Sequence, residues 1–376
     1  MKLPAAIALA LLLHCHAGAA PLRIEQNVAT DVNGAGDVVG ETRYSDGSRR
    51  AVLSRDGIVS GLGTLGGAES YTTAINEQGT IIGASLTAAN EWHAFVYRVG
   101  HGMRDLGTLG GRGSHAVAVG RRNHVVGYAD TEDGAYQAFL HDGTRMTGLG
   151  TLGGRNSYAT AVNAHGHVVG AAHDAHGYRR AFLYKPGAGM VELPALGGRA
   201  SVATAINDHG MVVGAAETAD RRWHAFLYDG AQTIDLGARI SRGDTFATGI
   251  SRDGKIVGTI RVNEFKSYSF VYDKGTTRIL PNLRADGIVS KITDDGQFVG
   301  ASAMGRTLQA GAIRTGEPSA EMTEREKFDL FMYTLLAVSF AAWVLWHVGP
   351  DLRAWWLRRR KIRGSPLFPG SPAPRH

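Results

Sequence analysis

Arginines and aromatic residues recur at fixed positions in this chain, and both residue types are suited to ligand binding. The arginines stand 15 or 16 residues before a repeated glycine, and the aromatic residues stand just before a repeated Ala-Phe pair. The arginines are Arg112, Arg155, Arg199, Arg242 and Arg284, and the aromatic residues are Trp92, Tyr136, Tyr178 and Trp223. Guanidinium groups pair well with anions, and exposed rings are enriched at contact surfaces. Two interpretations remain open: both sets face a ligand, or the arginines brace glycine loops while the rings pack between repeats.

Histidines raise the question of a metal site. The ones that fall in neighbouring repeats are His165, His167, His173, His176 and His209. His165 and His209 belong to hairpin turns, whereas His173 and His176 follow the next strand, so we expect them on opposite faces. We therefore predict no metal site. The turn Asp294-Asp295-Gly296 lacks the repeated carboxylates of a calcium loop.

No motif for nucleophilic or cofactor chemistry is evident. The segment GLGTLGG at 61–67 and again at 148–154 matches G-x-G-x-x-G formally. A dinucleotide site would need a helix after these glycines, and a strand pattern follows both copies. We interpret them as turn glycines and predict a protein without a cofactor and without catalytic residues. Cys15 is the only cysteine, and it lies in the first 19 residues.

The elements that position these residues are seven copies of one unit. Each copy ends in a glycine, and consecutive closing glycines are 42 to 44 residues apart. They are Gly40, Gly83, Gly127, Gly170, Gly214, Gly258 and Gly300. Each unit contains four short patterns that favour strands, with turn signals such as Asn76 to Gly79 between the first two. No helical periodicity of useful length appears between residues 20 and 327.

Four strands in about 43 residues is the spacing of a propeller blade. We predict an all-β fold, a seven-bladed β-propeller over residues 20–313, with an open β-solenoid as the alternative. A solenoid needs polar caps, and none is evident. The last unit lacks its LGTLGG strand, so we expect Leu22, Arg23 and Ile24 to supply a strand that closes the ring.

The repeats resemble the HAF family of probable extracellular repeats. The residues that carry the resemblance are WHAFVY at 92–97, YQAFLH at 136–141, RRAFLY at 179–184 and WHAFLY at 223–228, alternating with LGTLGG. It covers about residues 29–311 and weakens in the last two units. The resemblance implies a secreted repeat protein and brings no catalytic residues with it.

Both ends of the chain read as targeting segments. Residues 1–19 have a charged start, a short apolar run and an A-x-A site, which is typical of a signal peptide, although Cys15 leaves a lipoprotein site as an alternative. We predict a polar stalk at 314–327, a transmembrane helix at 328–348 and a basic cytoplasmic tail at 349–376. The span could instead be a sorting signal that is removed on export.

Charge and composition exclude some functions. The chain of 376 residues carries a formal net charge of +6, but the excess lies at its ends, so the repeats have no electrostatic footprint for nucleic acid. We predict a single-pass membrane protein with its repeats outside the cytoplasm. Its expected role is to bind an anionic or glycan ligand or an envelope protein. The alternatives are an assembly subunit of a cell-envelope complex and a propeller-based glycan lyase or hydrolase.

Overall fold

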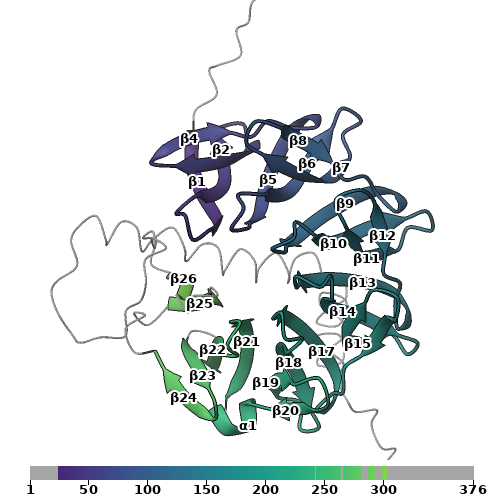
Figure 1. Ribbon diagram of the computed structural model, residues 1–376, viewed down its shortest axis with the longest axis vertical. Helices are drawn as coiled ribbons and strands as arrows, with labels where there is room; N and C mark the ends of the chain where they lie inside the picture. Colours follow the sequence, from purple (N-terminus) through teal and green to yellow (C-terminus); the bar gives the residue numbers. More distant parts are fainter. Residues whose placement is uncertain (1–23, 242, 264–265, 281–286, 293–297, 303–376) are drawn as a thin grey trace, which may run out of the picture.

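The computed structural model describes residues 24–302, apart from 242, 264–265, 281–286 and 293–297. Within these ranges the strands form six four-stranded antiparallel sheets and one two-stranded sheet. The sheets are arranged around a common centre, with the first strand of each sheet innermost (Figure 1). This is the predicted architecture of a β-propeller. We call the four-stranded sheets blades 1 to 6 in chain order.

Each blade uses four consecutive strands, as the repeat pattern predicts. Blade 1 contains β1 (Ile24–Val32), β2 (Val38–Tyr44), β3 (Arg49–Arg55) and β4 (Ile58–Gly61). Blade 2 contains β5 (Gly66–Ile75), β6 (Ile81–Thr87), β7 (Trp92–Arg98) and β8 (Gly102–Asp105). Blade 3 contains β9 (Gly110–Val119), β10 (Val125–Thr131), β11 (Tyr136–His141) and β12 (Met146–Gly148).

The second half of the ring repeats this order. Blade 4 contains β13 (Gly153–Val162), β14 (Val168–Asp174), β15 (Arg179–Lys185) and β16 (Gly189–Glu192). Blade 5 contains β17 (Gly197–Ile206), β18 (Val212–Thr218), β19 (Trp223–Tyr228) and β20 (Thr233–Asp235). Blade 6 contains β21 (Asp244–Ile250), β22 (Ile256–Asn263), β23 (Lys266–Asp273) and β24 (Thr276–Ile279). The two-stranded sheet contains β25 (Gly287–Ile292) and β26 (Phe298–Ser302).

The hydrophobic core lies between neighbouring blades. The Ala-Phe pair of the third strand is its centre, and Phe95, Phe139, Phe182 and Phe226 are at most 1% exposed. One cluster joins Val126 and Ala138 of blade 3 to Ala159 and Phe182 of blade 4. A small residue followed by a ring therefore recurs in the sequence because each blade packs its third strand against the next blade.

Buried hydroxyl groups join neighbouring blades by hydrogen bonds. Ser114 Oγ on β9 accepts the backbone N–H of Ala94 in blade 2 at 2.8 Å. Ser70, Ser157, Ser201 and Thr245 make the same contact in the other blades. Turn asparagines add a second link, since Asn76 Nδ2 donates to the carbonyl of Gly120 at 3.0 Å. The repeated polar residues thus hold the ring together.

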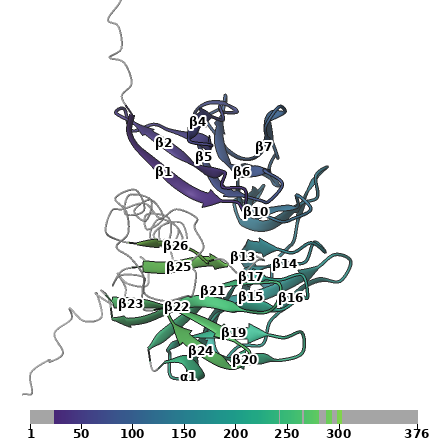
Figure 2. The same ribbon diagram turned by 60° about the vertical axis from the view of Figure 1, so that its left-hand side comes forward.

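The ends of the repeat region differ from the sequence-based expectation. Ile24 does not complete a last blade, because it belongs to β1 and pairs with Tyr44 of β2. The two-stranded sheet lies between blade 6 and β1 (Figures 1 and 2), where Lys291 Nζ is 3.3 Å from both carboxylate oxygens of Asp31. The rest of the predicted seventh blade lies outside the described residues, as do Leu22 and Arg23.

One short helix interrupts the strands. The helix α1 (Gly237–Ile240) occupies the position where the LGTLGG motif is replaced by LGARIS. Asp235 Oδ1 accepts the N–H of Ala238 at 2.9 Å, which supports this turn. Among the described residues no helix has the length and apolar character that crossing a bilayer requires. The predicted span at 328–348 lies outside them.

Candidate ligand-binding face

Three of the repeated arginines lie in first strands, whereas their position beside a glycine pair suggests the loops that lead into those strands. Arg112, Arg155 and Arg199 are the third residues of β9, β13 and β17, respectively, and all three are exposed. The first strands begin at the end of the blade where the second strands finish. We call this end of the ring the arginine face, and the opposite end the turn face. Arg242 and Arg284 lie outside the described residues.

A local irregularity puts each arginine on the surface. In blade 3, Gly110 pairs with Thr131 and Ser114 pairs with Ala129, so residues 111–113 bulge out of the ladder. A Cβ atom on Gly111 would lie 2.6 Å from Cβ of Asp130, so only glycine fits there. The glycine pair before each arginine therefore serves the bulge, and the bulge directs the arginine outward.

Each arginine contacts a loop of the preceding blade. Arg112 Nε is 3.0 Å from Oε1 of Glu91 in blade 2, although the Arg112 side chain remains 89% exposed. Arg155 donates to the backbone carbonyl of Asp133 at 3.3 Å. The guanidinium carbon of Arg199 is 5.3 Å from the ring centre of Tyr178. Exposed contacts of this kind contribute little stability, so a ligand can replace them at low cost.

Two of the repeated aromatic residues, Trp92 and Trp223, pack against rings of the next blade, as the second interpretation of their repeat expects. The ring centre of Trp92, at the start of β7, lies 5.3 Å from that of Tyr71 and 6.4 Å from that of His115 in blade 3. Trp223 at the start of β19 lies 6.1 Å from Phe246 of blade 6. Tyr136 begins β11 and Tyr178 precedes β15, and both are partly buried. The rings form a rigid base beside the arginines.

A row of rings that the sequence analysis missed extends this base. Tyr71 donates or accepts a hydrogen bond with His115 Nδ1 at 2.8 Å, and His115 stacks on Tyr128 at 5.0 Å. Burial raises the pKa of both Tyr71 and Tyr128, so these phenols stay neutral. The sequence does contain a pattern that could have predicted this row, because Tyr71, His115, Tyr158 and Phe246 occupy one repeat position in β5, β9, β13 and β21.

Arg49 of β3 is fixed at the edge of this row and is not free for a ligand. Its guanidinium carbon lies 4.3 Å from the ring centre of Tyr71 and 5.3 Å from that of Trp92. Glu41 and Glu69 oxygens lie 3.6 and 3.4 Å from its nitrogens. Arg49 therefore contributes to the structure of blades 1 and 2, unlike the exposed arginines farther along the chain.

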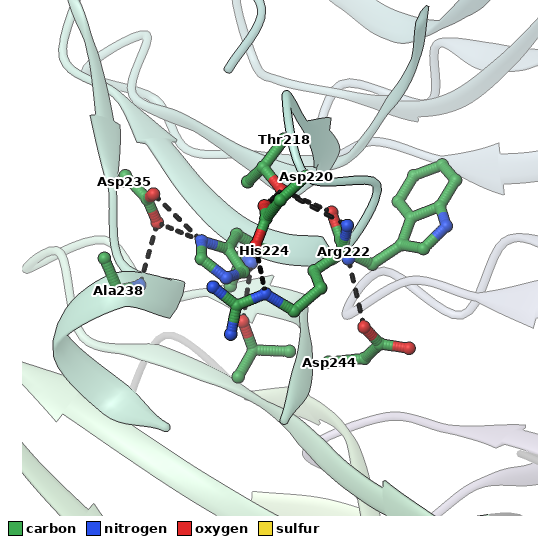
Figure 3. Close-up of polar contacts among 10 residues, drawn as sticks. Thr218, Asp220, Arg222, His224, Asp235, Ala238 and Asp244 are labelled. Carbon is green, nitrogen blue, oxygen red and sulfur yellow. Dashed lines mark hydrogen bonds and ion pairs between the residues drawn. The ribbon is translucent and has the colours of Figure 1, made fainter. Parts of the chain in front are cut away.

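The loop before Trp223 shows how the face is held in place (Figure 3). Thr218 Oγ1 donates to Asp220 Oδ1, and Arg222 Nε donates to Asp220 Oδ2 at 2.7 Å. The Thr218 hydroxyl is the main cause that lowers the pKa of Asp220, followed by Arg222. The backbone N–H of Trp223 donates to Asp244 Oδ1 of blade 6 at 3.1 Å. The loop is thus fixed both internally and to its neighbour.

Two histidine–carboxylate pairs resemble parts of a catalytic site. His93 Nδ1 is 2.7 Å from Asp105, and His224 Nδ1 is 2.9 Å from Asp235. A histidine held by a carboxylate can act as a general base when its other nitrogen reaches a substrate. His224 is only 4% exposed, and its Nε2 is shielded from solvent and has no hydrogen-bond partner among the described residues. These pairs join the third and fourth strands of their blades.

The histidines of the hairpin turns do not form a metal centre. Across the part of the chain that the structure describes, no three histidine, cysteine, aspartate or glutamate side chains are arranged to hold a metal ion. The first glycine of the LGTLGG motif has the positive φ of a turn glycine, 83° at Gly63 and 78° at Gly150, as predicted. The closing glycine pair instead belongs to the first strand of the next blade, where β5 begins at Gly66 and β13 at Gly153.

Comparisons with known proteins support the fold. No protein-family model matches this chain, and no curated protein matches its sequence. The β-propeller domain of the Trilobed protease from Pyrococcus furiosus is similar, with 10% identity and a TM-score of 0.51, over 75% of this chain and 93% of that one. The S511A mutant of puromycin hydrolase has 15% identity and a TM-score of 0.49, over 75% of this chain and 51% of that one. The first likeness shows a β-propeller and nothing about function. The resemblance to HAF repeats stays a prediction.

Proposed function

We propose that this protein is a binding module that recognises an acidic polymer, such as an anionic glycan, on its arginine face. The observation that carries the proposal is the regular placement of Arg112, Arg155 and Arg199. They occupy equivalent positions in three consecutive blades, and all three are exposed. A polymer that carries repeated negative charges can contact several such positions at once, whereas a small anion contacts one.

The energetics favour exchange of the present contacts for ligand contacts. Exposed ion pairs such as Arg112–Glu91 contribute about 0–1 kcal/mol. Charge-assisted hydrogen bonds to an anion contribute about 1.5–3 kcal/mol before ordering costs. The packed rings below the arginines limit the movement of the loops, which lowers the entropy lost on binding.

The proposal includes a location outside the cytoplasm. It rests on the signal-peptide pattern at 1–19, the apolar run at 328–348 and the basic tail at 349–376. A complete ring of seven blades would occupy the chain between the signal-peptide pattern and the polar stalk predicted at 314–327. This arrangement would place the arginine face among the acidic polymers of a cell envelope.

The proposed alternative of an assembly subunit has less support. The exposed large hydrophobic residues of the described chain include Ile58 and Val59 on β4, Val191 on β16 and Ile279 on β24. These residues lie on the outer strands of three different blades, so they form no single apolar surface. A catalytic role would need a reactive group that a substrate can reach, and the shielded His224 Nε2 argues against its use as a base.

Binding of defined polymers to the full chain tests the proposal. Dextran sulfate and polygalacturonate are the acidic probes, and neutral dextran is the control. We expect the acidic probes to bind and the triple variant Arg112→Ala, Arg155→Ala, Arg199→Ala to lose about tenfold or more in affinity. The matched control removes the exposed arginines Arg122, Arg145 and Arg278 from elsewhere and should bind like the wild type.

Two outcomes would overturn the proposal. One is that no acidic polymer binds the wild-type chain. The other is that both triple variants lose the same affinity, because net charge and not the arginine face would then explain binding. Salt should weaken the wild-type interaction strongly, since exposed charges are screened over about 10 Å at 0.1 M.

A further inference from the structure

A cavity on the turn face lies between blades 4 and 5 and is unrelated to the arginine face. Its volume is about 330 Å³. The groups that line it include His165 and His167 from the turn after β13, Lys185 from β15, His209 from the turn after β17, and Tyr228 from β19. This volume is within the range of small-ligand pockets, roughly 300–1,000 Å³.

Two equivalent turns bring the imidazoles together. Asn163 Oδ1 accepts the N–H groups of His165 and His167, both at 3.0 Å. Asn207 Oδ1 accepts the N–H of His209 at 3.1 Å in the next blade. Asn163 Nδ2 also donates to the carbonyl of Asn207 at 3.1 Å, which fixes one turn against the other. The backbone that carries the three rings is therefore rigid.

Two carboxylates belong to this region, Asp208 in the cavity lining and Asp229 between the lining residues Tyr228 and Gly230, and both already accept hydrogen bonds. Asp208 Oδ1 accepts the N–H of Ala164 at 2.9 Å, and its other oxygen is 3.8 Å from Arg252. Asp229 accepts the N–H groups of Ala231 and Gln232. The ammonium group of Lys185 has no carboxylate partner within 4.0 Å among the described residues. The cavity thus has one free cation and three groups that can become cations.

The surroundings of His167 disfavour its protonated form. Burial is the main cause that lowers the pKa of His167, and the charges of Lys185 and His165 lower it further. The other titratable groups in the cavity lining are Asp208, His209 and Tyr228. Tyr228 donates its hydroxyl to the carbonyl of Gly230. An anion would reverse the electrostatic cause and favour protonation.

We propose that this cavity binds a tetrahedral dianion of the phosphate class, with uptake of protons by its histidines. Ammonium and imidazolium groups act as compact donors that suit the oxygens of a tetrahedral anion from several directions. No arginine lines this cavity, so its charged contacts to an anion would come from Lys185 and the imidazoles. The free ion and a phosphorylated sugar share this chemistry.

Calorimetry with sulfate tests the proton linkage, because sulfate keeps the same charge across the pH range used. We expect sulfate to bind the full chain about tenfold more tightly near pH 5.5 than near pH 8, since a histidine whose pKa rises on binding couples the two equilibria. Histidine-selective NMR should show the pKa of at least one cavity imidazole rising when sulfate is added. Inorganic phosphate and glucose 1-phosphate then show which source fits.

Matched variants assign the site. The triple variant His165→Asn, His167→Asn, His209→Asn should abolish most of the pH dependence, and Lys185→Gln should weaken binding at both pH values. His101→Asn removes an exposed histidine from a turn-face loop of blade 2 and should change nothing. The triple arginine variant should retain sulfate binding, which separates this site from the arginine face. Absence of sulfate and phosphate binding, or equal affinity at both pH values, would overturn the proposal.

Discussion

His141 illustrates how a single residue can depart from its repeat. It stands where other blades have Tyr97, Tyr184 and Tyr228, and it is 3% exposed. Its Nδ1 accepts the N–H of Gly143 at 3.0 Å, an arrangement that requires this nitrogen to be unprotonated. Burial is the main cause that lowers its pKa, and the charge of Arg104 adds to it.

The lowered pKa of His141 predicts a loss of stability in mild acid. The unfolded chain takes up the proton near pH 6.5, whereas the folded chain resists it. Stability is therefore full above about pH 6.5 and falls as the pH drops below that value. His141→Tyr should reduce the fall in melting temperature between about pH 8 and pH 5. Part of that fall should remain, because the pKa of His167 is also lowered. Parallel profiles for wild type and variant would contradict this.

At the scale of the element, the closing glycines are required by close approach of two strands. The β5–β6 ladder shifts register between Thr72 and Ala74, and Gly83 pairs with Thr72 at that shift. A Cβ on Gly83 would lie under 3.0 Å from the carbonyl oxygen of Tyr71. The same crowding occurs at Gly127 and Gly170. This explains why the glycine recurs although its φ is not positive.

Gly83→Ala should destabilise the protein by about 1–3 kcal/mol or more, because backbone on β5 must move to admit the methyl group. Gly61→Ala is the matched control, since Gly61 ends β4 and has no atom within 4 Å of the corresponding Cβ position. Chemical denaturation of both variants measures the difference. Equal stability of the two variants would show that the ladder adapts more easily than the structure suggests.

The repeat pattern predicted the elements better than the site. Four strands per unit, the hairpin turns and the buried Ala-Phe pairs follow from local periodicity. The strand position of Arg112 does not, because its bulge depends on the packing of Gly111 against Asp130 of the neighbouring strand. The packing of Trp92 on His115 depends on how two blades meet, which the spacing of residues within one repeat does not show.

For the whole molecule, an ion pair joins the two-stranded sheet to blade 1, at what we call the seam of the ring. Asp31 and Lys291 occupy one repeat position, where blades 2 to 5 have alanine and blade 6 has glycine. Asp31 of blade 1 also accepts the N–H of Ile75 of blade 2 at 3.1 Å, so its carboxylate is held in place while it contacts Lys291. At this repeat position only the first and last units carry a charge, and the two charges have opposite signs. The pair therefore favours contact between these two units over contact of either unit with another blade.

Lys291→Glu should lower the free energy of unfolding by about 1 kcal/mol, because two carboxylates would then meet at the seam. Lys291→Ala restores the residue common to other blades and should have about half the effect or less. The melting temperature of the full chain at low and high salt measures both. A salt-independent effect, or none in the glutamate variant, would show that the seam does not depend on this pair.

The most direct measurement of the central claim is arginine footprinting on the full chain. Phenylglyoxal modification, followed by mass spectrometry, reports the reactivity of each arginine with and without dextran sulfate. The account predicts that dextran sulfate protects Arg112, Arg155 and Arg199, while the exposed Arg122, Arg145 and Arg278 react as before. Equal protection of both sets, or protection of neither, would contradict recognition by the arginine face.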